Sequence, residues 1–221
     1  AIPATAIPIG FAALAAYAFA FIEFRGRDWL FIGTVSLMAV PIQLALIPLL
    51  TTWVNGAHLT IPFTEKTLTI FPDLNVNMHG ATAAWLTQTG VTIPFAVFLL
   101  HNAFAALPRE LLESARLDGA DHMTTFRRVV VPLTAPAFMA LAILQFLFAW
   151  NEYLIPSVML SGSDPIHLPS AVRLANIVGE ISSAGPGAAA ATFVQIAVPL
   201  LVFFVLQRHI VRGLLTGSVN G

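Results

Sequence analysis

Polar and charged side chains gather in one stretch of this otherwise apolar chain, residues 108–132, which reads PRELLESARLDGADHMTTFRRVVVP. Neither a His-Glu-x2-His zinc motif nor a Gly-x-Ser-x-Gly nucleophile turn occurs there or elsewhere in the sequence. Apolar segments long enough to cross a bilayer flank the stretch on both sides. An amphipathic double helix held between two membrane spans has no lipid to face. Its expected chemistry is therefore that of a docking surface for another protein.

Local signals divide this stretch into two helices and a turn. Pro108 suits the first helical position, and Gly119 can take the left-handed conformation that ends the first helix. Asp121 then caps a second helix through Val131, which Pro132 ends. The pattern predicts a helical hairpin with one outward face. A solvated loop packed under the membrane bundle is an alternative that the pattern alone leaves open.

Composition places the chain in a membrane. Hydrophobic residues make up 57% and charged residues 10% of the 221 positions, whereas soluble domains have roughly 45–50% and about 25%. The absence of cysteine excludes disulfide frameworks and thiolate chemistry, and the net charge of −1 indicates no nucleic-acid partner. We therefore expect an all-α integral membrane fold with five visible transmembrane helices. The apolar runs are 1–22, 29–52, 82–104, 136–157 and 189–207.

The placement of arginine and lysine predicts the orientation. Eight of the ten basic residues fall in three segments, and Lys66 and Arg173 lie in the loops between them. The basic segments are 23–28, 105–135 and 208–221, and the other loops are 53–81 and 158–188. By the positive-inside tendency, the polar stretch and the C-terminus are cytoplasmic, and the loop 53–81 is extracytoplasmic.

The connecting segments carry weaker signals. Alternation of apolar residues with threonine in 58–63 and 67–71 predicts a short hairpin, with an unstructured connector as the alternative. A short amphipathic helix is expected near 168–178. Kinks are expected at prolines within the apolar runs, namely Pro41, Pro48, Pro94 and Pro199.

The spacing of the polar stretch resembles a known motif. ESA at 113–115, glycine at 119 and VVVP at 129–132 are similar to the EAA loop of ABC importer permeases, Glu-Ala-Ala, x3, Gly, x9, Ile-x-Leu-Pro. This sequence differs from the motif at three positions: Ser114 replaces the second alanine, Val129 the isoleucine and Val131 the leucine. The similarity extends to LPRE at 107–110, DGA at 118–120, WNE at 150–152 and the segment 207–215. Together these resemble carbohydrate permeases of the maltose G-subunit type, in the α-glucoside branch.

The resemblance implies a function and a set of partners. The chain would be one permease domain over 1–221, a multi-pass protein of the bacterial inner membrane that moves sugars inward. Its implied partners are a homologous permease in a heterodimer, two ATPase subunits that bind ATP and Mg, and an extracytoplasmic solute-binding protein. The family normally has six spans, so a first span is expected to be missing upstream. The chain itself has no phosphate-binding loop, because its only lysine, Lys66, follows Glu65. It is not expected to be an enzyme or to bind a cofactor or metal.

The resemblance also assigns residues. In the hairpin, Glu113 would be the charged contact to the ATPase, Ala115 a close-approach position and Gly119 the turn. The full coupling set is Arg109, Glu110, Glu113, Ser114, Ala115, Asp118, Gly119, Ala120, Met123 and Phe126. The C-terminal tail would reach between the ATPase subunits, with a frayed terminus as the alternative. It comprises Gly217, Ser218, Val219, Asn220 and Gly221.

Polar residues within spans are costly and become candidates for a sugar path. They are Gln43, Gln145, Trp150, Asn151 and Glu152. For Trp150 and Glu152, an interfacial aromatic belt with a snorkelling carboxylate is the alternative. An ion-coupled secondary transporter would instead show inverted repeats and a carboxylate near mid-bilayer, and neither is found in the sequence. A membrane enzyme would need one of the motifs excluded above.

Overall fold

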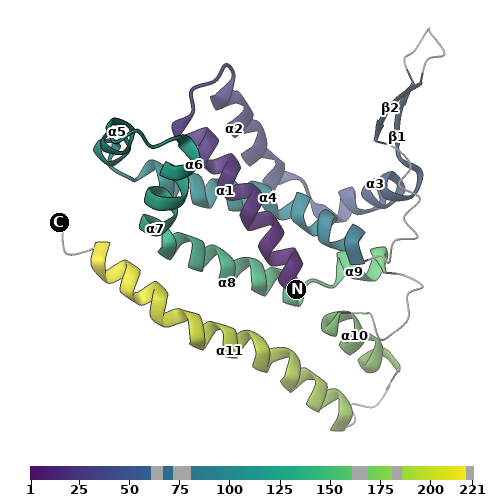
Figure 1. The fold of residues 1–221 in the computed structure, drawn as a ribbon. Helices are drawn as coiled ribbons and strands as arrows, with labels where there is room; N and C mark the ends of the chain where they lie inside the picture. The colour runs from purple at the N-terminus through teal and green to yellow at the C-terminus, as the bar shows by residue number, and fades with distance from the viewer. Residues whose placement is uncertain (61–66, 72–80, 161–168, 181–185, 218–221) are drawn as a thin grey trace.

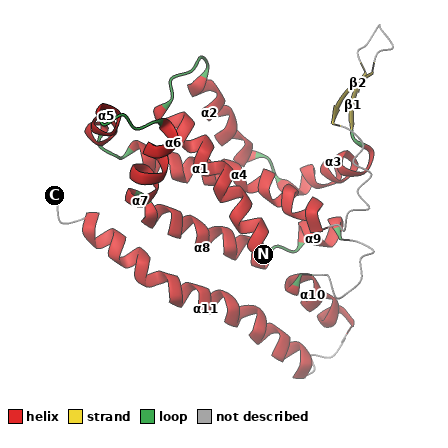
Figure 2. Ribbon diagram, viewed as in Figure 1, coloured by secondary structure: helices red, strands yellow, loops and turns green. Residues whose placement is uncertain are grey.

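Helices make up nearly all of the computed structural model (Figure 2), which confirms the all-α prediction. It describes residues 1–60, 67–71, 81–160, 169–180 and 186–217. Two of its helices, α1 (Ile2–Phe21) and α4 (Ala81–Ala105), are long and apolar enough to cross a membrane without interruption. They match the first and third predicted spans. They also pack against each other at the centre of the molecule (Figure 1).

Small side chains bring α1 and α4 close together. Ala12 and Ala16 of α1 and Ala96 of α4 are all fully buried in one cluster. Lipid tails are as apolar as leucine, so membrane helices associate by van der Waals contact, which small residues at the interface permit. Leu100 of α4 and Leu141 of α8 (Ala135–Asn151) complete this core. The packing thus fixes α1, α4 and α8 as the body of the fold.

The second predicted span, 29–52, is not one straight helix. It divides into α2 (Arg27–Ser36), a 3-10 turn (Leu37–Ala39) and α3 (Ile42–Asn55), with a bend of 105° between the two halves. The cause is Pro41, which disfavours helical geometry at the residue before it, and Val40 is extended with ψ 116°. By contrast, the other three prolines with predicted kinks lie inside α3, α4 and α11.

The C-terminal part of the chain packs along one side of this body (Figure 1). The fourth predicted span becomes α8 followed by α9 (Leu154–Met159), and α8 is bent by 77° from the helical segment before it. The predicted amphipathic helix is α10 (Ser170–Glu180), and the fifth span lies within α11 (Pro186–Gly217), which runs along α8 (Figure 1). In the described residues, two helices can cross a membrane by length and composition, or four if each bent pair counts as one span.

The predicted hairpin in the long loop is confirmed. Strands β1 (Ala57–Thr60) and β2 (Thr67–Phe71) pair antiparallel, with His58 opposite Thr69. They precede α4, whereas the polar stretch follows it (Figure 1). With 25 residues at about 1.5 Å each, α4 separates the two by roughly 37 Å. That distance exceeds the hydrocarbon thickness of a bilayer.

We therefore predict that the strands and the polar stretch lie on opposite sides of the membrane. The chain has no native cysteine, so Ser114→Cys and Thr69→Cys each create a single reactive thiol. In oriented vesicles, an impermeant maleimide is expected to label Ser114→Cys only from the cytoplasmic side and Thr69→Cys only from the other. Labelling of both from one side would contradict this topology.

Candidate functional site

The polar stretch folds as the predicted helical hairpin. Its first arm is α5 (Arg109–Leu117), and its second is α6 (His122–Thr125). A π-helical turn (Phe126–Val130) and α7 (Val131–Leu133) then lead to α8. The hairpin lies at the C-terminal ends of α1 and α4 (Figure 1).

The turn between the arms has the geometry predicted for Gly119. The residue has φ of 78°, in the left-handed region. Its N–H donates to the carbonyl of Arg116, and the N–H of Ala120 donates to that of Ala115, both at 3.0 Å. These two bonds form a Schellman motif, which satisfies the last carbonyls of a helix. The turn therefore depends on a residue that tolerates positive φ.

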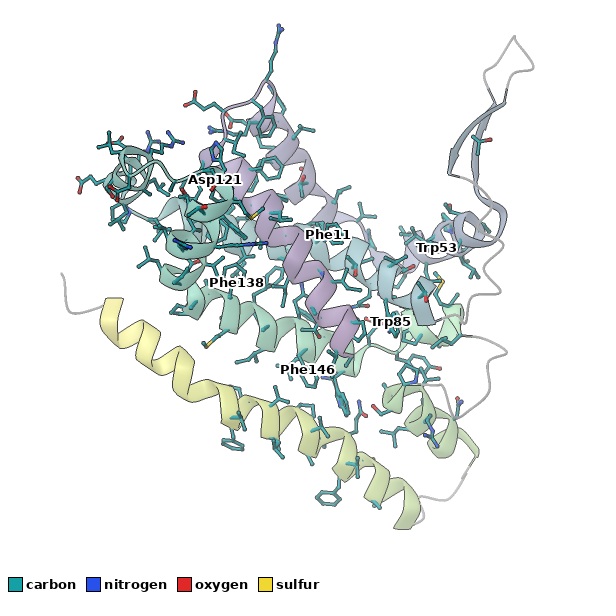
Figure 3. The ribbon with its side chains drawn as sticks, in the orientation of Figure 1. Phe11, Trp53, Trp85, Asp121, Phe138 and Phe146 are labelled. Atoms are coloured by element: carbon teal, nitrogen blue, oxygen red, sulfur yellow. The ribbon has the colours of Figure 1, made fainter. Side chains whose placement is uncertain are left out.

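Asp121 caps the second arm, as predicted. Its Oδ1 accepts a hydrogen bond from the N–H of Thr124 at 3.0 Å. The hydrogen bonds from Thr124 lower the pKa of this exposed carboxyl below its usual value of 3.8. Figure 3 shows Asp121 in the hairpin, close to α1. The ionised form of the side chain thus fixes the start of α6.

The second arm does not end at Pro132, in contrast to the prediction. A proline ring in an α-helix collides with the carbonyl four residues earlier. Here the N–H of Val131 donates to the carbonyl of Phe126, five residues back, so the turn before the proline is widened. The helix continues to Leu133 and breaks at Thr134, whose hydroxyl donates to the carbonyl of Val130 at 2.7 Å. Nothing in the motif spacing indicates this wider turn.

The inner face of the hairpin joins the membrane core. Leu112 and Val130 are buried in the same cluster as Phe104. The ring of Phe126 meets that of Tyr17 edge-on at 5.3 Å between centroids. Phe126, which the sequence places in the coupling set, therefore packs against α1. Ala115 is half-buried and contributes its carbonyl to the turn.

The outer face of α5 lies opposite Leu112. Glu110, Ser114 and Leu117 are exposed there, at the four- and three-residue spacing of one helical face. Leu117 is 89% exposed and Met123, beyond the turn, 45%. Leu117 was absent from the coupling set predicted from sequence. Leu117 lies five residues after the buried Leu112, which places it on the opposite side of the helix. This spacing is the signal in the sequence that indicates an outward side chain.

A charged hollow of about 230 Å³ separates α5 from the connection between α1 and α2. Its charged lining residues are Glu23, Arg27, Arg109, Glu113 and Arg116. Glu113 thus lies on the flank of α5, although it is exposed. The remaining predicted coupling residues, Asp118 and Ala120, belong to the turn itself. The surface that the hairpin offers combines exposed apolar side chains with charges of both signs.

The structure does not bring the five candidate sugar-path residues together. Gln43 is exposed near the start of α3, whereas Gln145 is fully buried in α8 and donates from Nε2 to the carbonyl of Thr92 in α4 at 3.4 Å. The Oε1 atom of Gln145 is buried without a hydrogen-bond partner in the described part of the chain.

The other three each have hydrogen-bond partners within the described residues. Trp150 stacks on Phe146 and donates to the carbonyl of Gln195 in α11 at 3.0 Å, and Gln195 donates back to the carbonyl of Trp150 at 3.3 Å. Asn151 donates to the carbonyl of Leu147 in its own helix. Glu152 accepts from the N–H groups of Leu154 and Ile155, so it caps α9. These bonds give the three side chains structural roles.

The tail predicted to reach the ATPase subunits falls mostly outside the described residues. Gly217 is the last residue of α11, and 218–221 are not described.

We predict that Gly119→Ala destabilises the hairpin by about 1–2 kcal/mol, the cost of a left-handed residue with a Cβ. No atom lies within 4 Å of the added Cβ, so the effect comes from the backbone alone, and Gly119→Asn should cost less. Gly33→Ala in α2, equally open but without positive φ, is the matched control. Hydrogen exchange of the hairpin amides measures the change. Equal protection in Gly119→Ala and Gly33→Ala would contradict the assignment.

We also predict a pH dependence at the cap. Because the folded pKa of Asp121 lies below 3.8, its contribution is complete above the unfolded pKa and is lost as the pH falls through the folded one. Amide protection of Thr124 should decrease in acid for this reason. Asp121→Asn caps without titrating and should lack this loss. Identical pH profiles for the two proteins would show that another group is responsible.

The sequence matches the family described as "binding-protein-dependent transport system inner membrane component" over residues 7–216. It is 43% identical to the alpha-glucoside transport system permease protein AglG of Rhizobium meliloti, covering all of this chain and 54% of that protein. It is 40% identical to the osmoprotective compounds uptake permease protein GgtD of Synechocystis sp., covering 100% of this chain and 67% of that protein. It is 33% identical to the trehalose transport system permease protein SugB of Mycobacterium tuberculosis, covering 98% of this chain and 72% of that protein.

This chain spans about half the length of the Rhizobium relative. The family match covers nearly all of this chain, including both arms of the hairpin. We conclude that the chain is an integral inner membrane protein and belongs to the family of binding-protein-dependent transport system inner membrane components.

Proposed function

We propose that the chain is the permease subunit of an ABC importer that carries sugars, α-glucosides or other di- or oligosaccharides, into the cytoplasm. Family membership supports the transport role. Two relatives support the substrate class, since they are named for alpha-glucoside and trehalose transport. The observation that carries the proposal is the hairpin, whose exposed outer face stands at the ends of two spanning helices.

We propose that two cytoplasmic ATPase subunits bind ATP and Mg²⁺ and drive this importer. The two ATPase subunits close on each other when they bind ATP. For both subunits to pull on the membrane part, each must dock on a hairpin of its own. This chain offers one, and a second homologous permease would supply the other. An extracytoplasmic solute-binding protein would deliver the sugar. The C-terminal residues beyond Gly217 would contribute a further contact to the ATPases.

The proposed mechanism uses the two faces of the hairpin. The outer face, with Leu117 at its centre, enters a cleft of the ATPase, where its apolar side chain leaves water. Glu113 on the flank pairs with a basic partner residue. The inner face, through Leu112 and Val130, is continuous with Phe104 of α4. Motion of the ATPase is therefore transmitted to the spans that enclose the sugar path.

Gln145 is the strongest of the proposed path residues. Its carbonyl oxygen is buried at the contact of α8 with α4 without a described partner, and buried acceptors are costly unless they are paired. A sugar hydroxyl or a water in the path would supply that donor.

An ion-coupled secondary transporter is the alternative that we considered. Such a carrier is expected to have a carboxylate within its spans to hold the coupling ion. The helices α1, α4 and α8 contain no acidic residue. The family match also supports the ATP-driven system.

We predict that Leu117→Ser weakens binding of the ATPase subunit about tenfold or more, because burial of a leucine contributes about 1.5–3 kcal/mol. Binding can be measured with the chain in nanodiscs and the purified ATPase. Leu44→Ser is the control, since Leu44 is 74% exposed but lies in α3, away from the hairpin.

Glu113→Ala tests the charged flank of the same surface. If the carboxylate pairs with a buried charge of the ATPase, its loss costs about 2–5 kcal/mol of binding. ATP-dependent sugar uptake should fall while membrane insertion is unchanged. Unaltered ATPase binding in both Leu117→Ser and Glu113→Ala would refute the docking role and favour a solvated loop.

A further inference from the structure

Tyr17 of α1 makes a polar contact between this spanning helix and the hairpin. It lies one turn before Phe21, the end of α1, and is only 6% exposed. Its hydroxyl forms a hydrogen bond with Nδ1 of His122 in α6, at 3.2 Å. Its ring meets Phe126 edge-on, in the π-helical turn. One side chain thus contacts the second arm of the hairpin at two successive places.

A series of aromatic rings continues from Tyr17 into the membrane body. Tyr17 contacts Phe21 of α1 at 5.2 Å between centroids, and Phe21 stacks on Phe104 of α4 at 6.3 Å. Phe104 in turn contacts Phe138 of α8 at 6.0 Å. Aromatic pairs at these separations attract beyond their buried area. The rings therefore join the hairpin to all three helices of the core.

Open space lies beside both arms of the hairpin. Hollows of about 410 and 230 Å³ are both lined by Phe21, Leu112 and Arg116, and the larger one is also lined by Tyr17, His122 and Thr125. Leu112 is the buried residue of α5. Close-packed interiors transmit displacement, whereas open space beside a helix lets it tilt. The hollows leave the hairpin room to tilt as a unit, with Leu112 and the contacts of Tyr17 as its attachments to the core.

We infer that Tyr17 is the positioning residue through which movement of the hairpin reaches α1. This inference rests on the proposed function and adds the part of the chain that carries the movement inward. When an ATPase displaces α5, the turn at Gly119 displaces α6, and the bond between His122 and Tyr17 displaces α1. A hydrogen bond is directional, so it resists the sliding that an edge-on ring contact tolerates. Tyr17 thus couples docking to the span.

The chain allows a direct measurement of this coupling. Since it has no cysteine, spin labels can be placed at Ala6→Cys near the start of α1 and Leu44→Cys in α3, outside the hairpin, both exposed positions. The distance between them is measured by pulsed electron resonance. The sample is the complete transporter in nanodiscs, with and without ATP and vanadate. The wild-type background is expected to show an ATP-dependent change in distance.

Tyr17→Phe removes only the hydroxyl and keeps the ring contacts. We expect the equilibrium constant for the ATP-shifted distance to fall about two- to tenfold, the range of one net hydrogen bond, while ATPase binding is unchanged. His122→Ala should lower this equilibrium constant by the same factor, and His122→Gln should lower it less. The double variant, Tyr17→Phe with His122→Ala, should lower it no further than either single variant. Tyr153→Phe changes the other tyrosine, which is 43% exposed next to α9, and should have no effect.

The outcomes separate the two proposals. A full ATP-dependent change in Tyr17→Phe, or additive effects of Tyr17→Phe and His122→Ala, would overturn the role of Tyr17 and leave the importer standing. If the wild-type chain neither binds the ATPase nor responds to ATP, the proposed function fails, and the role of Tyr17 fails with it.

Discussion

The close contact of α1 with α4 is the constraint on which the rest of the structure depends. Lipid gives two apolar helices no hydrophobic reason to associate, so van der Waals contact has to hold them. Alanines at positions 12, 13 and 16 of α1 provide it by letting the backbones approach. The same contact brings Tyr17 and Phe104 together at one end of the pair. The hairpin packs on that end, so its position follows from the alanine contact.

The sequence predicted the hairpin well because its turn depends on local chemistry. The left-handed Gly119 and the cap at Asp121 follow from residue type and spacing alone, and both were confirmed. The direction of each side chain was harder to predict. Phe126 belongs to the coupling set expected from the sequence, and in the structure its ring packs on Tyr17, 109 positions earlier in the chain. A contact over that separation is set by the packing of α1, which no local pattern reports.

The interrupted spans also show that local sequence predicts some features and not others. Hydropathy reports how much apolar sequence is present but not whether its helix is straight, so the run 29–52 predicts one span where the structure has two helices. The break at Val40 follows from the proline after it, yet Pro48, Pro94 and Pro199 lie within helices. Neighbouring elements decide which of these outcomes occurs. The five candidate path residues do not form one site, and three of them, Trp150, Asn151 and Glu152, are held by hydrogen bonds to backbone groups.

The π-helical turn between the hairpin and α8 has a consequence for how such chains can vary. A π turn is typically an α-helix into which one residue has been inserted, and the extra residue is absorbed locally as a bulge. The helices on either side then keep their rotational phase. A deletion of one residue between Phe126 and Val130 would remove the bulge and bring the proline ring back against the carbonyl four residues before it, so Pro132 would have to be replaced as well. With both changes together, the junction can lose one residue without rotating the hairpin relative to α8.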